Sequence, residues 1–433
     1  MTFSIIVCLV AFVTLVLMLR GDRLSLGMPI AYLFLLLLIH VPGAIAHVVG
    51  GHVLQDTPYT ELGIWLTAIG SMAFVTGVWL ACQRTVPSLM IHAAQRDRFW
   101  LFCLVAGWLV TYAFRFLRDV PSLASALEKS GAVWMLGVLL GLGAAAKRGD
   151  VKWVVIWLTA LVVYPLISLL IGGFLSYGTT AVVIVLAALA VSTRSSVRVA
   201  IGLVVASLLA FNLFLSYFQH RNEIRSAVWG GAPIEDRVDA SLSMFRDLTW
   251  FDPTNDRHLI SLDARLNQNY FVGLAAVRLE EGEVEYLRGR SVSEGLVALV
   301  PRVLWPDKPV FGGSPRIVGD MTGLTLSETT SFGVGNVMEF HINFGIPGVI
   351  GGFLILGWAL GTLDRKAAVA NAAGDLGSLF LYFLPAAALI QPNGSVVELA
   401  GGAAAGWVAA VAWKFVWQRW SGRDAPSAAR LPA

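Results

Sequence analysis

Long apolar runs recur along the chain and alternate with short polar connections. Most of these runs contain about 15 to 22 residues, close to the length that an α-helix needs to cross ~30 Å of hydrocarbon. Because lipid offers no hydrogen-bond partner to the backbone, segments that cross it must be helices. The pattern predicts eleven membrane-spanning helices, at Thr2–Leu19, Met28–Val49, Leu62–Ala81, Phe99–Phe116, Gly131–Ala146, Trp153–Gly172, Tyr177–Ser192, Val199–Phe218, Pro347–Leu363, Leu376–Ile390 and Val396–Val416.

The composition agrees with this pattern. Hydrophobic residues make up 57% of the chain and charged residues 14%, which excludes an ordinary soluble domain. We therefore predict an all-α polytopic membrane protein. Its predicted parts are eight spans in residues 1–218, a large loop in 219–346, three spans in 347–418 and a tail in 419–433. The first apolar run lacks a basic region before it, so we expect a retained helix rather than a signal peptide.

Lysine and arginine residues predict the orientation of the spans, because short cytoplasmic connections are enriched in them. One set of connections, together with the C-terminal tail, carries sixteen of these residues, whereas the opposite short connections carry three. The N-terminus and the large loop are therefore expected on the external side, and the C-terminus in the cytoplasm. The lipid bilayer is the partner that the spans require, and the small net charge of +3 gives no indication of a nucleic-acid partner.

The large loop is too long to lack structure of its own. From Ser261 to Leu279, apolar residues recur at helical spacing, which predicts one helix with Arg265, Gln268 and Asn269 on its polar face. A second helix is predicted from Ser293 to Val300, where a following proline ends it. The loop is therefore expected to form short helices over one face of the membrane.

Twelve basic and seventeen acidic residues give this loop a net negative charge, so an anion site must come from a few convergent cations. Arginine suits phosphate because its planar guanidinium donates two parallel hydrogen bonds, whereas lysine contributes a point charge. Taken singly, each cation is also compatible with a salt-bridged or interfacial side chain. Prolines in VPRVLWPDKP, residues 300–309, stiffen the backbone around Arg302 and Lys308 and favour these two as ligand-binding residues. The candidate cations are Arg221, Arg225, Arg265, Arg302 and Lys308.

A second polar group lies where the chain re-enters the membrane, in SFGVGNVMEFHINFGIPG, residues 331–348. Glu339 is a candidate general base there, although a carboxylate at this position also stabilises the N-terminus of a helix. Asn343 is a further polar candidate, and His341 is the weaker one, because an interfacial histidine is often structural. The acidic run from Glu280 to Glu285 is typical of a solvated helix end, and no histidine or cysteine spacing indicates a metal site.

Four segments within residues 261–350 together resemble one family. They are DARLNQNYFVG, EYLRGRSV, VPRVLWPDKPVFGG and SFGVGNVMEFHINFGIPG. They resemble the bacterial Wzy-type polymerases, which join oligosaccharide repeat units into O-antigen or exopolysaccharide. In that family P-R-x-x-W/F-P-x-K-P is followed by E-x-x-x-N-F-G-x-x-G, and the matching residues are Pro301, Arg302, Trp305, Pro306, Lys308, Pro309, Glu339, Asn343, Phe344, Gly345 and Gly348. His341 stands where an aromatic residue is expected, so no role is carried over to it.

The resemblance implies a GT-C-like glycosyltransferase of the bacterial inner membrane, with its active site in the periplasmic loop. A hydroxyl of an incoming undecaprenyl-pyrophosphate-linked oligosaccharide would attack the anomeric carbon of the growing chain, whose lipid pyrophosphate leaves. Arg265, Arg302 and Lys308 would bind the pyrophosphate without a metal or other cofactor, and Glu339 would take the acceptor's proton, so that Arg302 and Glu339 carry the catalysis. A flippase and a chain-length regulator are the implied protein partners. Further candidate residues are Arg221, Arg225, His341 and Asn343.

Three alternatives share part of this pattern. An O-antigen ligase has similar topology and chemistry but transfers finished glycan to lipid A-core. A flippase or transporter would need polar residues distributed through its spans, whereas these spans are nearly free of charge. A non-enzymatic scaffold of an export complex would have no need of Arg302, Lys308 or Glu339.

Overall fold

A computed structural model describes residues 1–22, 24–51, 53–83, 96–112, 123–172, 176–192, 196–246, 250–300, 305, 307–309, 313–325 and 333–421. Within these ranges all regular secondary structure is helical. The first ten helices are α1 (Thr2–Asp22), α2 (Met28–Leu38), α3 (Val41–Val49), α4 (Thr57–Cys82), α5 (Arg96–Tyr112), α6 (Leu123–Gly131), α7 (Val133–Arg148), α8 (Val151–Gly172), α9 (Ser176–Ser192) and α10 (Ser196–Trp229). Each of the first eight predicted spans overlaps one of these helices, except that the second is divided between α2 and α3 at His40. Helix α6 was not predicted, and α10 continues beyond the predicted end at Phe218 to Trp229.

Several of these helices have the length and composition of membrane spans. In the part of the chain that the structure describes, six helical segments are long and apolar enough to cross a membrane. They are Thr2–Arg20, Met28–Val49, Thr57–Cys82, Ser125–Ala146, Asn336–Ala373 and Val396–Trp420. Shorter apolar helical segments are Phe99–Thr111, Val151–Ile167, Thr179–Val191 and Leu376–Leu389. The chain is thus an α-helical membrane protein.

The described part of the large loop contains five short helices: α11 (Ile234–Arg246), α12 (Asp256–Leu266), α13 (Asn269–Glu280), α14 (Arg290–Ala298) and α15 (Ser314–Thr322). The second predicted loop helix corresponds to α14. The prediction of one helix from Ser261 to Leu279 is wrong, because the chain breaks at Asn267, whose φ and ψ are −128° and 69°. Asn269 on the far side of the break is fully buried, so Arg265, Gln268 and Asn269 share no polar helix face.

The last three helices are α16 (Asn336–Ala373), α17 (Leu376–Leu389) and α18 (Val396–Trp420). A kink at Phe344 and Gly345 divides α16 into two limbs, since both residues have non-helical backbone angles. Gly345 has a φ of 64°, which favours glycine, and Pro347 begins the second limb without needing a backbone donor. The predicted ninth span starts at Pro347 and matches this second limb, and the first limb carries Glu339.

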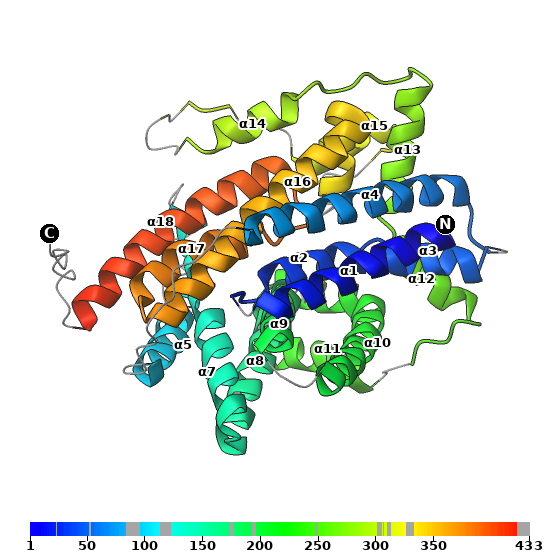
Figure 1. Ribbon diagram of the computed structural model, residues 1–433. Helices are drawn as coiled ribbons and strands as arrows, with labels where there is room; N and C mark the ends of the chain where they lie inside the picture. Colours follow the sequence, from blue (N-terminus) through cyan, green and yellow to red (C-terminus); the bar gives the residue numbers. More distant parts are fainter. Residues whose placement is uncertain are drawn as a thin grey trace, which may run out of the picture.

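Helix α4 lies at the centre of the packing. In Figure 1 it runs beside α16, with α13 against its N-terminal part. Small residues allow these close contacts: a Cβ at Gly357 would lie 2.2 Å from the Phe74 carbonyl oxygen, and one at Gly273 would lie 1.9 Å from the Tyr59 carbonyl oxygen. The close contact at Gly357 lies between α16 and α4, and the close contact at Gly273 lies between the loop helix α13 and α4. The short helices of the loop are therefore fixed to the membrane-spanning helices by direct backbone approach.

Candidate functional site

Three arginines of the large loop gather at the end of α10. Arg221 and Arg225 follow the predicted span on α10, and Arg265 comes from α12. The guanidinium carbons of Arg265 and Arg221 lie 4.3 and 4.9 Å from the centre of the Phe218 ring, which ends the predicted span. Arg225 lies over Trp229, at 5.3 Å. The structure thus joins three of the candidate cations into one arginine cluster, defined as Arg221, Arg225 and Arg265.

The three positive charges of the arginine cluster are held close together. Burial, reinforced by the charges of Arg221 and Arg225, lowers the pKa of Arg265 to about 10. Burial, reinforced by Arg225, also lowers the pKa of Arg221. No described carboxylate lies within ion-pair distance of Arg221 or Arg265, and Arg221 donates from Nε to the Asn222 amide oxygen at 3.3 Å. Such a cluster attracts an anion able to accept several hydrogen bonds.

The rest of the DARLNQN segment fastens α12 and α13 to the membrane helices. Asp263 Oδ1 lies 2.8 Å from His47 Nε2 and accepts from Asn267 Nδ2 at 2.6 Å. Asn269 Nδ2 donates to the backbone oxygen of His40 at 2.7 Å, and its Oδ1 lies 2.7 Å from His40 Nδ1. These bonds explain the break between the two helices. They also leave Arg265 directed to the neighbouring helix α10.

Glu339 lies on the first limb of α16 and is fully buried. Its Oε2 accepts a hydrogen bond of 2.7 Å from the backbone amide of Val396, the first residue of α18. The carboxylate therefore stabilises the N-terminus of α18, and Glu339 also lies in the first turn of its own helix, α16, as one of the two interpretations expected. Its Oε1 accepts no hydrogen bond of ordinary geometry from the described residues, although the Ser291 hydroxyl is close enough to interact with the carboxylate.

Asn343, one turn after Glu339, joins α16 to the EYLRGRSV segment. Its Oδ1 accepts from the backbone amide of Gly289 at 3.0 Å, and its Nδ2 donates to Ser291 Oγ at 2.8 Å and to the Glu339 carbonyl at 2.7 Å. The backbone amide of Leu287 also donates to the Ile342 carbonyl at 2.8 Å. Two of the four segments that carried the family resemblance are thus in direct contact.

The groups around the Glu339 carboxylate are themselves charged or buried. Glu294 and Glu398 both interact electrostatically with Glu339; Glu294 pairs with Arg290 at 3.3 Å, and Glu398 belongs to the capping box of α18. His341 is 7% exposed, its ring centre lies 6.4 Å from that of Tyr286, and its Nδ1 has no partner among the described residues. No group of metal-ligating side chains occurs within the described ranges.

The remaining predicted cations lie elsewhere. Arg302 is outside the described residues. Lys308 donates to the backbone oxygen of Val300 at 3.1 Å, in the segment that follows α14. Figure 1 shows α12 and α14 on opposite sides of α4. The hydrogen bond to Val300 holds Lys308 near the end of α14, the helix that packs against α18 and α16, whereas Arg265 lies with Arg221 over Phe218.

Sequence reasoning assigned no role to Ser291, to Arg288 or to Arg290. All three belong to EYLRGRSV, which was noted only as part of the family resemblance. Ser291 comes close to Glu339 through a contact between segments about fifty residues apart, the Asn343 to Ser291 bond. The place of EYLRGRSV among the four segments of the resemblance is the one signal that the sequence offers for these residues.

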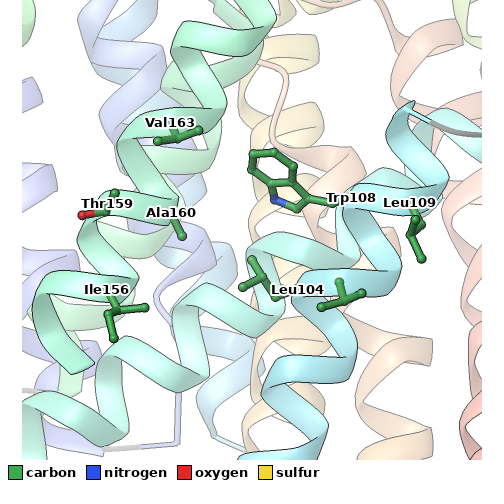
Figure 2. Close-up of a pocket in the computed structure, with 8 residues that line it drawn as sticks. Leu104, Trp108, Leu109, Ile156, Thr159, Ala160 and Val163 are labelled. Carbon is green, nitrogen blue, oxygen red and sulfur yellow. The ribbon is translucent and has the colours of Figure 1, made fainter. Parts of the chain in front are cut away.

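A separate cavity of about 640 Å³ opens between α5 and α8 and holds none of these residues. Figure 2 shows Trp108 reaching from α5 toward α8 across it. Its lining is almost wholly apolar, as expected for a crevice among membrane helices. The lining residues are Leu104, Val105, Trp108, Leu109, Ile156, Thr159, Ala160 and Val163.

Residues 63–384 match the family model of a domain of unknown function, DUF8712. The chain belongs to this family. The match runs from α4 to α17 and therefore includes both the arginine cluster and the first limb of α16. No curated protein and no solved structure matches the chain.

Proposed function

We propose that the protein is a glycosyltransferase of the bacterial inner membrane that polymerises undecaprenyl-pyrophosphate-linked oligosaccharide repeat units at the periplasmic face. The arginine cluster carries the proposal. Three guanidinium groups lie close together, and among the described residues Arg221 and Arg265 have no carboxylate partner, which favours a ligand with several negative oxygens. Two of the three arginines lie beside Phe218, the last residue of a predicted span, which favours a ligand attached to lipid. A lipid pyrophosphate has both properties.

The second support is the resemblance of the four segments to Wzy-type polymerases, a family whose helices are arranged in the GT-C-like manner. Contacts in the structure join the EYLRGRSV segment to the segment that contains Glu339. Segments that form one site in a related enzyme should meet in space. In this proposal a flippase delivers the repeat unit and a chain-length regulator limits the product.

The proposed reaction is a substitution at the anomeric carbon of the growing chain. A hydroxyl of the incoming repeat unit forms the new carbon–oxygen bond, and the bond to the lipid pyrophosphate breaks with its electron pair. Glu339 takes the proton of the hydroxyl on Oε1, which accepts no hydrogen bond of ordinary geometry from the described residues. Arg302 and Lys308 stabilise the negative charge that grows on the leaving oxygen, and the arginine cluster, on the other side of α4 from α14 (Figure 1), binds the pyrophosphate of the second lipid-linked substrate.

The burial of Glu339 places a condition on this reaction. Its carboxylate is covered, and α14 packs against α18 beside it. The acceptor hydroxyl can reach Oε1 only when the α14 segment moves away from α18. The same burial keeps bulk water from the base in the absence of substrate, which limits hydrolysis of the lipid-linked donor.

The test uses purified protein in proteoliposomes with a defined undecaprenyl-pyrophosphate-linked repeat unit, with and without chelator. The wild-type protein should form a ladder of polymers in both conditions. Arg221→Gln combined with Arg265→Gln should leave single repeat units, with a rate reduced on the order of 100-fold or more. Arg246→Gln is the matched control, since Arg246 is exposed and pairs with Asp239 at 3.6 Å. A wild-type protein that makes no ladder but transfers glycan to lipid A-core would be a ligase instead.

A further inference from the structure

Arg288 has a backbone conformation that residues with a side chain rarely adopt. Its φ is 49°, in the left-handed region, and the following Gly289 has a φ of 88°. For an L-residue this region brings the Cβ close to its own backbone, so glycine is the usual choice there. An arginine at this position is held against its local preference.

Hydrogen bonds on both sides hold Arg288 in place. The backbone amide of Leu287 donates to the Ile342 carbonyl at 2.8 Å, and that of Gly289 donates to Asn343 Oδ1 at 3.0 Å. Both acceptors belong to the end of the first limb of α16, one turn beyond Glu339. The backbone of Arg288 is therefore fixed relative to Glu339 by its two chain neighbours.

The charge of Arg288 has no acidic partner among the described residues, and the residue is exposed. The neighbouring arginines differ in this respect. Arg290 pairs with Glu294 at 3.3 Å, and Arg278 pairs with Glu283 at 2.8 Å. Among Arg278, Arg288 and Arg290, only Arg288 has no ion-pair partner among the described residues, so its charge is available to a ligand.

An apolar strip begins directly beside Arg288. A Cβ at Gly289 would lie 3.0 Å from the Phe344 ring, which is 53% exposed. Ile346 and Ile350, on the second limb of α16, are also exposed, at 39% and 45%. Helix α16 is long and apolar enough to span a membrane, and exposed apolar side chains on such a helix suit contact with lipid. A fixed cation at the end of such a strip suits an amphiphile with an anionic head and a hydrocarbon tail.

We propose that Arg288 is a substrate-binding residue that contacts the phosphate of a lipid-linked substrate beside Glu339. The strained backbone is retained because it presents the guanidinium at the membrane boundary, as strain at a functional site does. The inference rests on the proposed function and deepens it, since it names a residue for the lipid phosphate on the Glu339 side of the molecule.

The experiment measures binding and thermal unfolding of Arg288→Gly, Arg288→Gln and the control Arg290→Gln, each in a protein that also carries Arg221→Gln and Arg265→Gln so that the arginine cluster does not mask the result. The probes are undecaprenyl pyrophosphate in phosphatidylcholine vesicles and inorganic pyrophosphate in solution. Glycine removes the strain, so Arg288→Gly should unfold at the same or a higher temperature than the protein with the two cluster substitutions alone. Both Arg288 variants should bind the lipid pyrophosphate about 10- to 100-fold more weakly, the loss expected for a hydrogen bond to a charged group. Arg290→Gln should stay within about twofold of the protein with the two cluster substitutions alone.

Distinct results would overturn the two proposals. If wild type binds the lipid pyrophosphate and the Arg288 substitutions cause no loss of binding beyond that of Arg221→Gln and Arg265→Gln, the role of Arg288 is rejected and the proposed function stands. If wild type binds neither probe, the proposed function and the role of Arg288 both fail. Equal binding of inorganic and lipid pyrophosphate, lost together in Arg288→Gly, would reject the lipid strip and identify free phosphate as the ligand.

Discussion

Replacing Glu339 separates its two roles, because the side chain both accepts a hydrogen bond and is proposed to accept a proton. In Glu339→Gln the amide oxygen can still accept from the Val396 amide, which is 2.7 Å from the carboxylate in the structure. A hydrogen bond to a charged group contributes ~1.5–3 kcal/mol and one to a neutral group ~0.5–1.5 kcal/mol, so the exchange should cost about 1 kcal/mol. Removal of a buried negative charge near Glu294 and Glu398 offsets part of this cost.

Glu339→Ala is expected to behave differently. It removes the acceptor, and the Val396 amide is then buried without a partner at a cost of ~1–3 kcal/mol. It also leaves a space in a fully buried position, which adds to the loss. The alanine variant should therefore unfold at a clearly lower temperature than the glutamine variant.

The assay compares polymer formation in proteoliposomes with the free energy of unfolding of the same preparations. If Glu339 is the general base, Glu339→Gln should lose about 10²–10⁴ in rate while its stability changes by about 1 kcal/mol. A glutamine variant that extends chains within about threefold of the wild-type rate would refute the role as base and leave only the contact with α18. An alanine variant as stable as wild type would refute the hydrogen-bond argument.

The remaining predictions concern charge, backbone and loop attachment. Burial and neighbouring positive charges lower the pKa of Arg265 to about 10, so its side chain stays charged at neutral pH. Arg265→Gln removes this charge from beside other positive charges, so the unfolding temperature should stay unchanged or rise. The stabilisation that added pyrophosphate gives to the wild-type protein should be lost in this variant. Gly345→Ala should destabilise the protein by ~1–3 kcal/mol, because a φ of 64° with a ψ of −150° is open to glycine alone; equal stability in a calorimetric scan would contradict the kink. Asp263→Ala removes the shared partner of His47 and Asn267 and should cost ~1–3 kcal/mol, seen as faster proteolysis of the loop. Asp256→Ala, in the exposed first turn of the same helix, is its control.

The membrane helices could be predicted because each follows from its own residues. An apolar run such as Leu62–Ala81 forms a helix in lipid whatever its neighbours are, and α4 covers it from Thr57 to Cys82. The same local reasoning failed at Ser261–Leu279. The spacing there is helical, yet the side chains of Asn267 and Asn269 form hydrogen bonds to α3, α4 and the backbone of His40, and these bonds end one helix and begin another.

The sequence by itself determined the fold class, the helical segments and the short set of polar residues from which a site could be built. Only the tertiary structure decided which of those residues meet. Arg265 joins Arg221 across about forty residues of chain, and Glu339 meets the Val396 amide across 57 residues. The physical reason is that the period of apolar residues acts within one helix, whereas a contact between distant side chains depends on how whole helices pack.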